Sequence, residues 1–73
     1  MTNQDIAVKL FEALQDGKRC AVEVQPITST RGDREDFYLR IDGKRTKVSK
    51  KLAVNAIHWG LYVNTLERQY QFL

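Results

Sequence analysis

The residues that could carry catalysis are few and are not arranged as a catalytic group. His58 is the only histidine and Cys20 the only cysteine. A helix that begins near Ser49 would place His58 on its exposed face near the C-terminal end, without an acidic side chain one turn away to orient it. Cys20 falls on the inward side of a predicted strand, where a thiol acts as a small apolar side chain. These positions predict a protein that is not an enzyme.

Cofactor and metal sites are equally unsupported by the sequence. Asp33, Glu35 and Asp36 form an acidic cluster in a polar segment, where neighbouring carboxylates are usually solvated. The chain contains no glycine-rich phosphate loop and no metal-ligand spacing. A single cysteine also cannot form an intramolecular disulfide or a cysteine-based zinc site. We therefore expect no cofactor, no metal and no small-molecule substrate.

The strongest functional signal is a concentration of positive charge. The chain has a formal net charge of +3, and residues 18–51 carry ten of its twelve basic residues. Five of these lie in one short segment: Lys44, Arg45, Lys47, Lys50 and Lys51. Two of them would open a helix, where the helix dipole disfavours cations. A charge placed against this local preference favours binding of a polyanionic surface, either nucleic acid or an acidic protein.

The elements that would position these residues form an α+β domain. Apolar residues at helical spacing predict a first helix that is capped by Thr2 or Asn3 and ends at Gly17, with an inward face of Ile6, Ala7, Leu10, Phe11 and Leu14. Alternation predicts strands at 19–25, 37–41 and 45–48, with Pro26 ending the first or restricting it to an edge. We expect residues 27–36 to form a loop with its tip at Gly32-Asp33.

Two local signals organise the second half of the chain. Asp42-Gly43 is a strong two-residue hairpin turn, and Ser49 predicts the N-cap of a second helix with Leu52, Ala53, Ala56, Ile57 and Gly60 inward. Gly60 could end this helix or let it continue toward Leu66, and residues 69–72 could be a strand or a frayed tail. The expected fold is α-β-β-β-α over residues 1–73: one domain with a three-stranded antiparallel sheet, both helices on one face, and room for an extra strand near 68–72.

The aromatic residues near the C-terminus have two interpretations. Trp59 could complete a small core or, with Tyr62, form a contact patch beside the basic residues. Phe72 fits a core position better. We therefore include Trp59 and Tyr62 in the predicted partner-binding set, together with the five basic residues above and with Arg31 and Arg34 from the polar segment.

The order of elements and the run Ser49-Lys50-Lys51-Leu52-Ala53 resemble the double-stranded-RNA-binding domain over about residues 3–66. Lys50, Lys51, Ala53 and Ala56 match that family's second helix, and Phe37 matches the aromatic residue of its second strand. The resemblance implies binding of duplex RNA through backbone contacts. The chain differs by lacking the glycine-containing loop before Ser49 and the Gly-Pro-x-His element, and it has Val54 where the family has a basic residue.

In size and charge polarity the chain also resembles small phage-encoded host-takeover proteins, among them inhibitors and antiterminators that bind host RNA polymerase. That resemblance implies a transcription regulator acting on an acidic surface of a polymerase subunit. The N-terminal segment is polar and acidic, unlike a signal peptide, and no apolar run is long enough to span a membrane. We therefore expect a cytoplasmic protein without a membrane partner. The protein partner and the nucleic-acid partner remain alternatives at this point.

Overall fold

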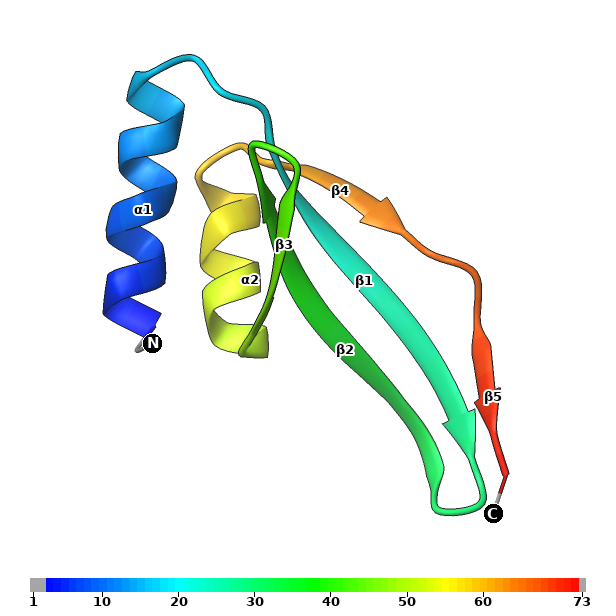
Figure 1. The fold of residues 1–73 in the computed structure, drawn as a ribbon. Coiled ribbons are helices and arrows are strands. Elements are labelled where there is room, and N and C mark those ends of the chain that lie inside the picture. The colour runs from blue at the N-terminus through cyan, green and yellow to red at the C-terminus, as the bar shows by residue number, and fades with distance from the viewer. Residues whose placement is uncertain (1–2, 73) are drawn as a thin grey trace.

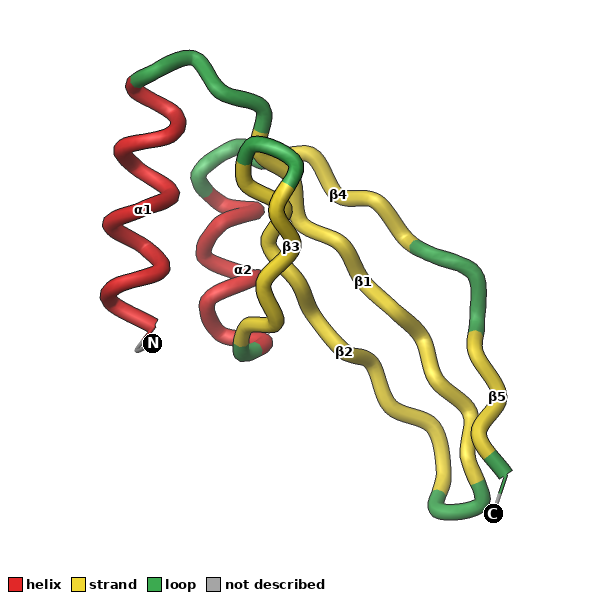
Figure 2. The backbone as a smooth tube through the Cα atoms, viewed as in Figure 1, coloured by secondary structure: helices red, strands yellow, loops and turns green. Residues whose placement is uncertain are grey.

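The computed structural model describes residues 3–72, which form two helices and a five-stranded mixed sheet (Figures 1 and 2). The elements in chain order are α1 (Asn3–Gln15), β1 (Cys20–Ser29), β2 (Gly32–Ile41), β3 (Lys44–Val48), α2 (Lys50–His58), β4 (Tyr62–Thr65) and β5 (Gln69–Gln71). The α+β class and the predicted order are therefore confirmed. Thr2, one of the two proposed caps of the first helix, lies outside the described residues.

The sheet has the strand order β3-β2-β1-β4, and β5 pairs with β1 beyond the end of β4. Strands β1, β2 and β3 are antiparallel, as predicted, whereas β4 and β5 both run parallel to β1. The extra C-terminal strand is thus confirmed as β5. Strand β4 was not predicted, because its four residues are all exposed and carry no alternation of apolar and polar side chains.

Both helices end where glycine permits a left-handed backbone. Gly17 has φ +73°, and the N–H of Lys18 donates to the carbonyl of Ala13 at 2.9 Å. Gly60 has φ +97°, and the N–H of Leu61 donates to the carbonyl of Ala56 at 3.2 Å. This is the Schellman pattern in both cases. It resolves the open question about α2, which ends at His58 and does not continue toward Leu66.

The start of α2 and the β2–β3 turn form as predicted. The Ser49 hydroxyl accepts a hydrogen bond from the N–H of Leu52 at 3.2 Å, which satisfies one of the free donors of the first turn. Asp42 and Gly43 have φ values of +51° and +83°, as a two-residue hairpin turn requires. This turn pairs Ile41 with Lys44 and so sets the β2–β3 register.

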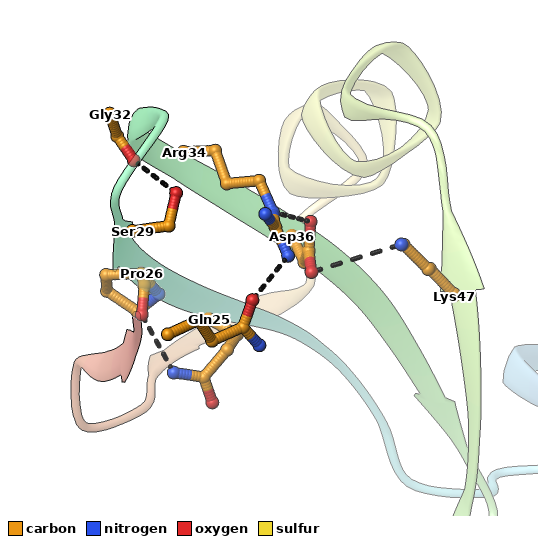
Figure 3. Close-up of polar contacts among 8 residues, drawn as sticks. Gln25, Pro26, Ser29, Gly32, Arg34, Asp36 and Lys47 are labelled. Carbon is orange, nitrogen blue, oxygen red and sulfur yellow. Dashed lines mark hydrogen bonds and ion pairs between the residues drawn. The ribbon is translucent and has the colours of Figure 1, made fainter. Parts of the chain in front are cut away.

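The prediction for residues 26–36 was wrong. Strand β1 continues through Pro26 to Ser29, and β2 begins at Gly32, so the hairpin turn is Thr30-Arg31. Pro26 is tolerated because the second ladder of β1 is interrupted beside it: β4 pairs with residues 21–24 and β5 with residues 27–29. The Gln25 amide bridges the gap by donating to the carbonyl of Glu67 and to the carbonyl of Pro26, of which Figure 3 shows the second. Pro26 has no N–H to donate, and at this break in the ladder no hydrogen bond is lost by its absence.

The longer hairpin gives the molecule its shape. The described residues extend over 42 × 22 × 20 Å. In Figure 1 the outer halves of β1 and β2, with β5 alongside, reach beyond the two helices. The helices therefore cover only the part of the sheet nearest the β2–β3 turn.

One side of the sheet, the helix face, packs against the helices. The buried cluster consists of Ile6, Leu10, Val22, Val24, Leu39, Val48, Leu52, Ala53, Ala56 and Leu61. The predicted inward faces are confirmed for most of these helical positions, but Phe11, Leu14, Ile57 and Gly60 are exposed to a substantial extent. The core position predicted for Phe72 is wrong, because its side chain is 66% exposed beyond the end of β5. A narrow stripe of each helix meets the sheet, and residues beside that stripe remain accessible.

Candidate binding face of the sheet

The other side of the sheet, here called the open face, is not covered by either helix. Residues that pair across strands point to the same side, so the register places them in rows. The first row, from β4 to β3, is Tyr62, Ala21, Arg40 and Arg45, and the second is Asn64, Glu23, Tyr38 and Lys47. Basic and aromatic side chains from β2, β3 and β4 therefore converge on one surface around Ala21 and Glu23 of β1.

Glu23 lies at the centre of the open face and is only 5% exposed. Its Oε1 is 3.3 Å from a terminal nitrogen of Arg40 and 3.4 Å from Nε of Arg45. Neither contact has hydrogen-bond geometry, because Oε1 has no hydrogen-bond partner. The attraction is therefore mainly coulombic, and one buried carboxylate holds two guanidinium groups near the sheet.

Arg45 also contacts an aromatic ring. Its Cζ lies 3.7 Å from the centroid of the Tyr38 ring, within the range of a cation–π interaction. Arg40 is fixed separately, since one of its terminal nitrogens donates to the carbonyl of Gly43 at 3.1 Å. Both arginines are thus held in defined positions while much of each side chain stays accessible, with exposed fractions of 44% for Arg40 and 39% for Arg45.

A second charged group extends the open face toward the hairpin tip (Figure 3). Asp36 lies 3.6 Å from Arg34 and 3.9 Å from Lys47, and Arg34 also donates to the side chain of Gln71 at 3.1 Å. Together with Arg40 and Arg45, these residues give the open face four basic groups against the two carboxylates of Glu23 and Asp36. The face therefore has an excess of positive charge despite its internal ion pairs.

The first row contains a depression. A hollow of about 440 Å³ is lined by Arg19, Cys20, Ala21, Arg40 and Gly43. Ala21 is the smallest side chain of its row and stands between two long ones, Arg40 on β2 and Tyr62 on β4. Tyr62, on the strand next to Ala21, is 75% exposed, so its ring is accessible.

The structure divides the predicted partner-binding residues among separate places. Arg34, Arg45, Lys47 and Tyr62 lie on the open face. Five others lie elsewhere: Lys44 on the helix-facing side of β3, Lys50 and Lys51 in the first turn of α2, Arg31 in the β1–β2 turn, and Trp59 at the end of α2. A continuous hairpin–helix surface is not formed, because alternate residues of a strand point to opposite sides.

Glu23, Tyr38 and Arg40 belong to the open face and were missed by the sequence analysis. The signal was present in the alternation of Tyr38 and Arg40 with Phe37, Leu39 and Ile41. Combined with the two-residue turn at Asp42-Gly43, this alternation places Arg40 opposite Arg45. Charge density along the sequence does not show which side chains a sheet brings together from different strands.

The helix layer carries a different kind of exposed surface. The rings of Phe11 on α1 and Trp59 at the end of α2 lie 4.7 Å apart between centroids, with a tilt of 40°. Phe11 is 47% exposed and Trp59 42% exposed. Other partly exposed apolar side chains of the helices are Val8, Leu14, Val54 and Ile57.

The residues considered for catalysis remain apart. His58 is exposed in the last turn of α2, and Cys20 is half-buried in β1 with its thiol 3.7 Å from the carbonyl of Lys18. Burial raises the pKa of the Cys20 thiol above its usual value, with a smaller contribution from the nearby charge of Asp42. Asp36 points to the open face, whereas Asp33 and Glu35 alternate to the other side.

Residues 3–72 offer neither a metal-binding cluster nor a membrane-spanning helix. That part of the chain contains no group of three or more His, Cys, Asp or Glu side chains placed to hold a metal ion. Neither described helix has the length and apolar character needed to cross a membrane. Comparison of the chain with protein-family models, with curated proteins and with solved structures gave no match.

Proposed function

We propose that this protein is a non-enzymatic transcription regulator that docks on RNA polymerase through its helix layer, with Phe11 and Trp59 at the centre of the contact. The observation that carries the proposal is the exposed aromatic pair. In a chain of 73 residues, apolar area for a core is scarce. Two large rings that contact each other and remain about half exposed are better explained by a partner that completes their burial.

The charges of the helix layer suit an acidic partner. Lys50 and Lys51 open α2, and among the described residues neither is within ion-pairing distance of a carboxylate. Cations at the rim of an apolar contact accelerate association with an acidic surface and contribute to choice of partner. A cytoplasmic location is part of this proposal.

The first test is capture of polymerase from nuclease-treated lysate of the cell in which the protein acts. We expect polymerase subunits to be retained by the wild-type protein and to be reduced about tenfold by Trp59→Ala, which removes a ring of the size that dominates interfaces. Phe72→Ala is the matched control, because Phe72 is also an exposed aromatic residue but lies after β5. Absence of polymerase from the wild-type capture, or equal capture by both variants, would refute the proposal.

Nucleic-acid binding at α2 is the second candidate, and one arrangement favours it. The first turn of α2, with Lys50 and Lys51, is the end of that helix that faces the outer hairpin, and the β1–β2 turn, with Arg31, lies beyond it at the hairpin tip (Figure 1). A duplex could contact both at once through its phosphates, as the resemblance to a double-stranded-RNA-binding domain implies.

Titration of duplex RNA at physiological salt tests the second candidate. Lys50→Ala and Lys51→Ala should each weaken binding without regard to sequence, because phosphate contacts carry no sequence information. Equal and weak binding of duplex RNA, duplex DNA and single strands by the wild-type protein and both variants would exclude it.

A further inference from the structure

We infer that the open face binds single-stranded nucleic acid, with bases stacked on Tyr62 and on the guanidinium of Arg45 and phosphates bound by the other basic side chains of the face. This activity goes beyond docking on a polymerase, because it uses the opposite side of the sheet. The inference depends on three features of the open face: its charge, its stacking surfaces and its hollow.

The charge of the open face suits a phosphate backbone. Arg34, Arg40, Arg45 and Lys47 exceed the two carboxylates of Glu23 and Asp36. Glu23 is buried and pulls the two arginines toward the sheet, so their remaining N–H groups are accessible in nearly fixed positions. A cationic group that is already positioned loses less conformational entropy when it binds a phosphate.

The stacking surfaces distinguish nucleic acid from other anions. The Tyr62 ring is largely exposed, and the Arg45 guanidinium lies over Tyr38 with its outer side accessible. Aromatic rings and guanidinium planes are the surfaces on which unpaired bases stack. An acidic protein segment could pair with the charges of the open face, but it has no bases to stack on the Tyr62 ring and the Arg45 guanidinium.

The hollow gives a base a place to enter the first row beside Arg40. Ala21 and Arg40 of the first row line it, and Tyr62 lies on β4 next to Ala21. Three strand spacings separate Tyr62 on β4 from Arg45 on β3, about 14 Å. A single strand lying along the first row would therefore meet Tyr62, the hollow, Arg40 and Arg45 in that order. A duplex keeps its bases paired and could not use the hollow.

The test is fluorescence anisotropy with labelled oligo-dT and oligo-U of about 20 nucleotides, beside duplexes of the same length. For the wild-type protein we expect tighter binding of single strands than of duplexes. Tyr62→Ala should weaken binding of single strands about tenfold by removing a stacking surface. Tyr70→Ala is the matched control, because Tyr70 is similarly exposed but pairs with Thr28, which points away from the open face.

Salt titrations test the phosphate contacts separately. Affinity for a single strand should fall with salt, and Lys47→Ala should reduce the slope of log K against log salt by about 0.7, the value for one phosphate. Lys44→Ala removes the same charge from the same strand but from the opposite side of the sheet, so the slope should not change. Tyr62→Ala should also leave the slope unchanged.

Three results would overturn the inference: duplexes that bind as tightly as single strands, equal effects of Tyr62→Ala and Tyr70→Ala, or equal effects of Lys47→Ala and Lys44→Ala on the slope. Circular dichroism of each variant establishes that it is folded, and the high exposure of Tyr62 makes its replacement tolerable. Failure here is distinguishable from failure of polymerase docking, because Trp59→Ala should leave oligonucleotide binding unchanged.

Discussion

The most informative perturbation of this fold is Glu23→Gln, which keeps the shape of the side chain and removes the charge shared by two arginines. Glu23 is buried, whereas Arg40 and Arg45 are 44% and 39% exposed, so this cluster lies between a surface ion pair and a buried one. Exposed pairs contribute about 0–1 kcal/mol, and loss of one partner from a fully buried pair costs about 3–5 kcal/mol. The absence of hydrogen-bond geometry at Oε1 places the expected cost toward the lower value.

We therefore expect Glu23→Gln to lower the free energy of unfolding by about 1–2 kcal/mol. In a domain of this size that corresponds to a fall in Tm of roughly 4–16 °C. The measurement is urea denaturation followed by circular dichroism, with Glu35→Gln as the control. Glu35 is an exposed carboxylate on β2 with no ion pair in the described part of the chain, so its replacement should change stability by less than about 0.5 kcal/mol.

The refuting result is a urea midpoint for Glu23→Gln equal to that of the wild type. It would mean that the buried carboxylate does not organise the open face, and that Arg40 and Arg45 are held by other contacts. The Arg45 interaction with Tyr38 would be the first to examine, since it does not involve Glu23. We also expect added salt to reduce, but not abolish, the stability difference between Glu23→Gln and the wild type, because partly exposed charges are only partly screened.

Three further predictions concern the core, a helix cap and the thiol. Leu39→Ala should destabilise the protein by about 2–5 kcal/mol by leaving a cavity, and an unchanged urea midpoint would exclude Leu39 from the core. Ser49→Ala should cost about 1 kcal/mol by removing the acceptor of the Leu52 N–H, visible as a lower midpoint that Ser49→Asp restores. Burial favours the neutral thiol of Cys20, so the midpoint of its alkylation rate against pH should lie above 9.0, the usual pKa; a midpoint below that value would contradict the burial seen here. The same raised pKa makes a stability contribution that is present below pH 9.0 and lost at higher pH, as thiolate formation begins to favour the unfolded chain.

Features fixed by neighbouring residues could be read from the sequence. Gly17 ends the first helix, Ser49 caps the second, and Asp42-Gly43 makes the turn, because each depends on backbone conformation within a few residues; the end of the second helix at Gly60 was predicted only as one of two alternatives. These signals were sufficient for the α+β class and for the antiparallel order of β1 to β3. The C-terminal strand was predicted as one of two alternatives.

Features that depend on distant residues could not be read. Pro26 predicts the end of a strand from its local sequence. The strand continues because β4 and β5 pair with β1 on either side of Pro26 and leave a gap beside it, where the Gln25 amide donates to the carbonyl of Glu67. Likewise Glu23 was an ordinary polar position in an alternating strand. Only the pairing of β1, β2 and β3 shows that two arginines converge on it.

The long side chains of the open face also shield buried residues of the sheet from solvent, and this role has to be distinguished from ligand binding. No helix covers this side of the sheet, yet Glu23 and Gln25 are buried there. Long side chains such as those of Arg40 and Arg45 can provide that cover with their aliphatic stems while their charged ends reach solvent. Arg45→Ala would remove the aliphatic stem that covers the sheet, the positive charge and the guanidinium plane together. Loss of binding by that variant would therefore not show which of the three matters.

Arg45→Lys separates the two tasks. It keeps an aliphatic stem and the positive charge but replaces the planar guanidinium with a compact ammonium group. If Arg45 serves only as cover for the sheet, the variant should match the wild type in both stability and oligonucleotide affinity. If a base stacks on its guanidinium, single-strand affinity should fall severalfold while the slope of the salt dependence stays the same, because the number of phosphate contacts is unchanged. The shape of the cation, rather than its charge, is therefore the property that decides whether this face recognises nucleic acid.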